Sequence, residues 1–169
     1  GTVDAGRLSV NGSIAASLVE IKTGAELGGS GTVGGIIARS GSTLAPGNSI
    51  GTLNVSGNAT LDSGSTYSVE VDDLGSSDKL AATGTVTIGS GVTLLVTPEN
   101  GTDTGATYAL NTQYTIITAQ SGVTGTFATV TENFAYLTAA VTYSGDGKNV
   151  YLTLTRSSGT GSSFASLVS

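Results

Sequence analysis

The chain has 169 residues, of which 26 are glycine, 2 are proline and 11% are charged. Its formal net charge of -6 is spread thinly and would repel a phosphate backbone, so we expect no nucleic-acid partner. The sequence contains no cysteine and no histidine, which excludes disulfides, thiolate metal sites and the usual general base, and we expect no cofactor, no metal and no small-molecule substrate.

Residues 1–99 predict a series of short β-strands. Apolar, polar and apolar residues alternate in triplets, as expected for strands with one buried face. The clearest triplets are Leu8-Ser9-Val10, Val19-Glu20-Ile21, Leu53-Asn54-Val55 and Val69-Glu70-Val71.

A second pattern recurs between these triplets: a glycine turn followed by a large apolar residue. It places Leu27, Leu44 and Leu61 seventeen residues apart, with looser echoes at Tyr67 and Leu94. A repeat in the high teens to low twenties is the length of one coil of a β-solenoid. We therefore expect an all-β fold in which residues 1–99 form β-helix coils.

Residues 100–156 differ from the coils, because aromatic residues gather there and the strands lengthen. Residues 137–143 and 150–154 alternate on either side of Ser144-Gly145-Asp146-Gly147-Lys148, which predicts a β-hairpin. We interpret 100–156 as a partly antiparallel β cap that covers the open end of the solenoid. The Ser/Gly-rich residues 157–169 predict a flexible linker toward a further domain.

Two glycine motifs resemble known functional motifs but lack their context. Residues 47–51 match the G-x-S-x-G nucleophile elbow around Ser49, yet no helix is predicted after Gly51. Residues 29–34 match G-x-G-x-x-G without a βαβ unit. We interpret both as solenoid turns and predict no catalytic and no cofactor-binding residue.

Acidic residues leave two alternatives open. The loop from Asp72 to Asp78 holds three carboxylates and could bind calcium, although such residues more often bond to the loop backbone. A polysaccharide-cleaving β-helix would need two paired acids. The candidates near strands are Glu20, Glu26, Glu70 and Asp72, and no spacing brings a particular pair together.

Residues 44–53, Leu-Ala-Pro-Gly-Asn-Ser-Ile-Gly-Thr-Leu, resemble the L-x-P-G-x-S-x-G-T-L segment of pertactin-like, Gram-negative autotransporter passengers. The order of later motifs is also similar to that family. They are Tyr67-x-Val69-Glu70-Val71, Ser77-Asp78-Lys79-Leu80, Gly122-x-x-Gly125-x-Phe127 and Val150-Tyr151-Leu152-Thr153-Leu154.

This resemblance implies a right-handed parallel β-helix at the C-terminal, autochaperone end of a type V secretion passenger. The partners it implies are upstream passenger coils and an outer-membrane β-barrel, with a location at the cell surface or outside a Gram-negative bacterium. We expect a structural module that nucleates β-helix folding and is not an enzyme. The alternatives are an adhesive surface that binds a host or a second copy, and a polysaccharide-acting β-helix.

Overall fold

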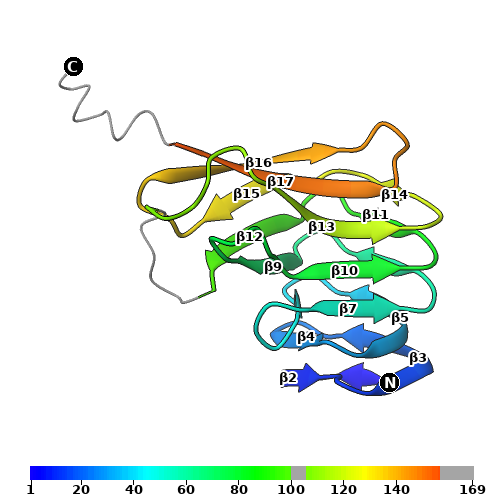
Figure 1. Cartoon of the computed structure of the whole chain (residues 1–169). Helices are drawn as coiled ribbons and strands as arrows, with labels where there is room; N and C mark the ends of the chain where they lie inside the picture. Colours follow the sequence, from blue (N-terminus) through cyan, green and yellow to red (C-terminus); the bar gives the residue numbers. More distant parts are fainter. Residues whose placement is uncertain (100–105, 157–169) are drawn as a thin grey trace.

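A computed structural model describes residues 1–99 and 106–156, and it confirms an all-β parallel β-helix with an antiparallel cap. The coils stack in one direction, with the N-terminal coil at one end and the hairpin β16–β17 at the other (Figure 1). No helix in the described residues is long and apolar enough to cross a membrane. The strands are β1 (Thr2–Val3), β2 (Gly6–Ser9), β3 (Ser13–Ile21), β4 (Ala25–Gly29), β5 (Thr32–Ala38), β6 (Thr43–Pro46), β7 (Thr52–Val55), β8 (Ala59–Leu61), β9 (Thr66–Val71), β10 (Lys79–Ala82), β11 (Val86–Ile88), β12 (Thr93–Pro98), β13 (Gln113–Ala119), β14 (Val123–Thr124), β15 (Thr129–Glu132), β16 (Leu137–Tyr143) and β17 (Asn149–Arg156).

One wall of the solenoid is a parallel sheet in the order β2-β4-β6-β9-β12-β15. The pleat sends alternate side chains into the interior. Leu27, Leu44, Tyr67 and Leu94 pair in register on these strands, and each is 0% exposed. They form a continuous apolar column along the solenoid axis.

A second sheet begins with β1, which pairs with β3, and β3, which pairs with β5, and it continues as two parallel ladders. β7, β10 and β13 follow one another in the first, and β8, β11 and β14 in the second. β5 is long enough to pair with both β7 and β8, so one strand turns the corner between the two ladders. One coil is therefore made of three short strands, such as β6, β7 and β8.

Leu61 does not continue the column of Leu27 and Leu44, although it follows Leu44 by seventeen residues in the sequence. Leu61 lies on β8 opposite Ala38 and Ile88, whereas Tyr67 is the partner of Leu44. The turn glycines show the true repeat: Gly24 N–H bonds to the Gly41 carbonyl, Gly41 to Gly64 and Gly64 to Gly91, each at 2.9 Å. The loops between strands differ in length from coil to coil, so the register and not a fixed spacing defines the column.

The C-terminal part closes the stack. β17 pairs antiparallel with β13, and the predicted hairpin is confirmed with Leu137 opposite Arg156 and Tyr143 opposite Val150. Within the proposed cap 100–156, β13 to β15 still run parallel to the coil below. The linker predicted for 157–169 lies outside the described residues.

Aromatic residues fill the interior beneath this cap. The rings of Tyr67 and Phe127 are stacked with centroids 6.0 Å apart, and Tyr108 meets Phe134 edge-on at 5.0 Å. The Tyr67 hydroxyl donates to the Ile116 carbonyl oxygen at 2.6 Å. A buried phenol with a satisfied hydroxyl combines a large apolar area with a directional bond between coils.

Candidate functional site at the β6–β7 loop

The loop of residues 47–51, here the β6–β7 loop, carries the G-x-S-x-G motif. Ser49 is exposed, and its Oγ donates to Glu99 Oε2 at 2.7 Å. The strand β7 follows the loop, so the strand-turn-helix geometry of a nucleophile elbow is not present. A carboxylate is the partner of this serine in place of the histidine that such an elbow uses.

The first half of the loop is tied to the first coil. Arg7 Nη2 on β2 donates to the Gly47 carbonyl oxygen at 2.8 Å. Asn48 Nδ2 donates to Asn11 Oδ1 at 2.6 Å. These bonds span 40 and 37 residues of sequence, so the loop connects coils that are distant along the chain.

The second half of the loop is tied to a later coil by Asp78. Gly51 N–H donates to Asp78 Oδ1 at 2.9 Å, and Glu70 N–H donates to Asp78 Oδ2 at 2.8 Å. Asp78 N–H in turn donates to the Glu70 carbonyl oxygen at 2.9 Å. One carboxyl group therefore joins the loop to β9 and to the start of β10.

A polar cavity of about 440 Å³ lies beside the loop. Of the four acids considered from the sequence, Glu26 and Glu70 line it, and Glu26 forms an ion pair with Arg7. Glu20 lies elsewhere and pairs with Arg39 at 2.7 Å. The lining residues are Arg7, Ser9, Glu26, Ala45, Pro46, Gly47, Asn48, Ser68, Glu70, Asp78 and Thr97.

The electrostatics of the cavity centre on Asp78, which is 2% exposed. Burial raises the pKa of Asp78 to about 7, although its two backbone N–H bonds act in the opposite direction. Burial also raises the pKa of Glu70, and the nearby Glu99 carboxylate adds to that rise. Sequence analysis left calcium binding by the Asp72 to Asp78 loop open and missed this role of Asp78, because the partners Gly51 and Glu70 are brought to it only by folding.

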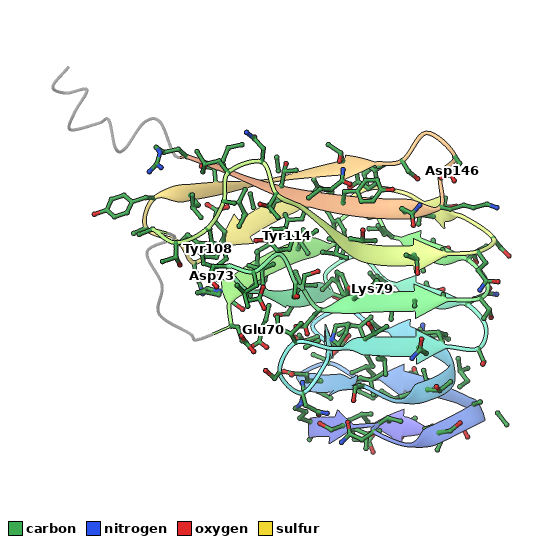
Figure 2. The ribbon with its side chains drawn as sticks, in the orientation of Figure 1. Glu70, Asp73, Lys79, Tyr108, Tyr114 and Asp146 are labelled. Atoms are coloured by element: carbon green, nitrogen blue, oxygen red, sulfur yellow. The ribbon has the colours of Figure 1, made fainter. Side chains whose placement is uncertain are left out.

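The calcium alternative finds no support in the placement of its residues. Asp72 Oδ1 accepts bonds from Leu74 N–H at 3.0 Å and Ser76 N–H at 2.8 Å, so it organises its own loop. Asp78 is directed toward Gly51 and Glu70 instead. Figure 2 shows Glu70 on β9 and Asp73 in the loop that follows this strand. In residues 1–99 and 106–156, no three acidic side chains gather in a group that could hold a metal ion.

The G-x-G-x-x-G motif lies where strands of neighbouring coils approach closely. A methyl group built on Gly31 would overlap the Gly12 carbonyl oxygen, and one on Gly34 would overlap that of Ala15. The motif spans the end of β4 and the start of β5, and both strands belong to parallel walls of the coil. The glycines therefore permit coil packing.

Comparisons with known proteins identify two similar curated sequences. An extracellular serine protease of Serratia marcescens is 38% identical over 169 residues, which is 99% of this chain and 16% of that protein. A second extracellular serine protease of the same organism is 35% identical over 156 residues, covering 90% of this chain and 15% of that protein. No family model matches the chain. The chain thus spans about one sixth of the curated relatives it matches.

These relatives correct one expectation. Absence of histidine and cysteine led us to expect that the chain is not an enzyme. That expectation is wrong, because both similar proteins are named as proteases. Composition describes only the residues present in this chain, and an active site is assembled from residues that can lie far apart in sequence.

Replacing Gly47 by alanine should lower the free energy of unfolding by at least about 2 kcal/mol. Gly47 has a φ of +90°, and an added methyl group would overlap Asp78 Oδ1 and the Ser49 carbonyl oxygen. Urea unfolding measures the change. The matched control is Gly145→Ala, since Gly145 has an ordinary φ and open space around it. Equal stability of the two variants would show that the loop tolerates a side chain at 47.

Proposed function

We propose that the chain is the C-terminal β-helix segment of an autotransporter passenger belonging to a secreted protease, and that its capped end folds first and templates the coils. Two kinds of observation support this. The motif order resembles that of autotransporter passengers, and the similar proteins are named extracellular serine proteases. Under this proposal the protein acts outside the cell or at its surface.

The difference between the two ends of the solenoid carries the proposal. Leu8 pairs in register with Leu27 and points into the same column, yet Leu8 is 38% exposed and Leu27 is 0% exposed. Ile14 is likewise 40% exposed, whereas its partner Val33 is 0% exposed. The first coil therefore presents an uncovered interior, as expected where a further coil stacks.

The opposite end is covered by the chain itself. β17 satisfies the edge of β13, and the aromatic pairs Tyr67–Phe127 and Tyr108–Phe134 close the interior. A solenoid gains stability from each interface between neighbouring units, so an end that the chain itself covers is the better nucleus for adding coils. The upstream passenger coils are the proposed partner of the open end.

Protease activity is proposed for the longer protein of which this chain is a part. The chain has no histidine, so a Ser-His-Asp triad in that protein would need its histidine from elsewhere in the polypeptide. The β-helix would support that enzyme and take part in its export across the outer membrane through a β-barrel partner.

Pulse-labelled hydrogen exchange during refolding tests the order of folding. We expect amides of β13 and β17 to gain protection before those of β3 and β5, since the capped end is the nucleus. Simultaneous protection of all four strands, or earlier protection of β3 and β5, would contradict the proposal. Leu8→Ala is the matched control, because truncating this partly exposed residue should leave the rate at β13 and β17 unchanged.

A further inference from the structure

The capped end of the solenoid presents one long strand with an unpaired edge. Within the described residues, β16 pairs with β17 on one side and is the last strand of its sheet (Figure 1). Its residues from Leu137 to Tyr143 pair with β17 in consecutive register, so no bulge interrupts the strand. An edge strand of this kind offers a row of backbone donors and acceptors to another chain.

The hydrogen bonds around β17 show which backbone groups of β16 are free. Residues of an antiparallel strand direct their N–H and C=O groups alternately to the two sides. Ser144 N–H donates to the Asn149 carbonyl oxygen at 3.0 Å, so the even-numbered residues of β16 bond to β17. On the β13 side of β17, the Leu154 carbonyl oxygen accepts a bond from Asn111 N–H at 2.9 Å, which agrees with this alternation. The groups that face the free edge belong to the odd-numbered residues Leu137, Ala139, Val141 and Tyr143.

β16 also lacks the features that usually keep another chain away from an edge strand. Soluble proteins place charged residues or proline on such edges, or keep the strands short. Residues 133–145 contain no charged residue and no proline. The other strands at the ends of the two sheets differ: β2 carries Arg7, β15 ends in Glu132, and β1 and β14 have two residues each. Among the described sheet ends, β16 alone is both long and uncharged.

A second copy of β16 fits this edge in an antiparallel register centred on Ala140. Two-fold symmetry then places Leu137 opposite Tyr143 of the second copy, and Ala139 opposite Val141. All of these residues have free backbone groups, so each pair exchanges two N–H···O bonds and the contact contains about eight. A shift of one residue would place free groups opposite groups already bonded to β17, and no ladder would form.

The side chains at this contact are compatible with a second copy. Thr138, Ala140 and Thr142 lie on the exposed face of β16. The register places Ala140 opposite itself and Thr138 opposite Thr142, and threonine pairs across neighbouring strands are stabilising. The net charge of -6 on each chain lies outside residues 133–145, where salt screens its repulsion. A second copy also brings an edge of the same length, so one contact satisfies both edges.

We propose that β16 is a self-association surface: the β16 strands of two copies of this chain pair antiparallel about Ala140 and join their sheets into one. The contact goes beyond the proposed function and does not depend on the order of folding. It leaves the first coil open, because that coil lies at the opposite end of the solenoid (Figure 1). One strand pair is smaller than a standard protein interface, so we expect a dissociation constant of about 10–300 μM.

Sedimentation equilibrium of the chain, from about 20 μM to about 1 mM, measures the association. Amide hydrogen exchange followed by NMR at the same two limits locates the contact. The Ala139 and Val141 amides face the free edge, so their exchange should slow by about 3-fold or more at the higher concentration. The Ala140 and Thr142 amides already bond to β17 and should not change.

Charged variants at the centre of the contact test the register. Ala140→Lys places two like charges opposite each other at an exposed position, so the dissociation constant should rise at least about 5-fold. Ala140→Glu should have the same effect. An equimolar mixture of the two variants should associate again, because lysine then lies opposite glutamate. Ser56→Lys is the matched control, since it adds the same charge at an exposed residue after β7 and should leave the dissociation constant unchanged.

Three results would overturn the proposal. The first is a wild-type chain that stays monomeric at about 1 mM. The second is association that Ala140→Lys does not weaken, as expected if the open first coils of two copies stack on each other. That mode would also leave the exchange of the Ala139 and Val141 amides unchanged. The third is a mixture of the lysine and glutamate variants that associates no better than either variant alone.

Discussion

Replacing Tyr67 by alanine should lower the free energy of unfolding by about 3–5 kcal/mol. Tyr67 is fully buried in the apolar column, stacks on Phe127 and donates its hydroxyl to the Ile116 carbonyl oxygen at 2.6 Å. Truncation therefore removes contacts within the sheet, the ring stack beneath the cap and a bond to β13 at once. Urea unfolding followed by circular dichroism measures the loss.

Two tyrosine variants calibrate this result. Tyr136→Ala removes a side chain that is 54% exposed, and we expect a change within about 0.5 kcal/mol. Tyr67→Phe keeps the ring and removes the hydroxyl, so it should cost about 1 kcal/mol. If Tyr67→Ala cost no more than Tyr67→Phe, the packing of this ring beneath the cap would not contribute to stability.

The global stability of the chain should fall as the pH rises from about 4 to about 7, by at most about 4 kcal/mol. The pKa of Asp78 rises from 3.8 to about 7 on folding, so the folded chain binds a proton more tightly than the unfolded chain. Between these values the unfolded state releases that proton, and stability is lost with increasing pH. Urea unfolding at a series of pH values checks the slope.

The carboxyl groups of Glu20 and Asp146 affect the stability of the chain in a lower pH range. Hydrogen bonds from Arg39 lower the pKa of Glu20, and those from Ser144 and Lys148 lower the pKa of Asp146. Their contribution to stability is present at neutral pH and is lost only as the pH falls below their usual values. Asp78→Asn should therefore remove most of the loss between pH 4 and 7 and leave the acid limb in place, while the raised pKa of Glu70 keeps a smaller loss in the same direction. A wild-type stability that is constant from pH 4 to 7 would contradict the assignment.

Local patterns predicted the elements well where one strand or one turn decides the structure. Alternation of Leu137 to Tyr143 and Val150 to Leu154 around a glycine-containing turn predicted the hairpin β16–β17, because both strands and their turn are contiguous. The same alternation predicted the buried faces of β7 and β9. These features depend on interactions within a few residues.

Contacts between coils could not be predicted in the same way. Leu61 follows Leu44 at the same spacing of seventeen residues by which Leu44 follows Leu27, but the loop lengths place Tyr67 opposite Leu44. The site at the β6–β7 loop depends on a bond that Arg7 donates to Gly47 and a bond that Asp78 accepts from Gly51, which span 40 and 27 residues. The sequence offers no local signal for such bonds, since the register of the coils sets them.

The turn glycines Gly24, Gly41, Gly64 and Gly91 are hydrogen-bonded in a column, so complete coils of the solenoid can be deleted or inserted at these turns. Cutting the chain at two neighbouring glycines of this column and rejoining it would remove one complete coil, and the turn before the cut would bond to the equivalent glycine of the next coil. Each such deletion would shorten the rod by about 4.8 Å, the spacing of hydrogen-bonded strands. Gain or loss of coils therefore offers a stepwise way to set how far the rest of the polypeptide stands from the capped end.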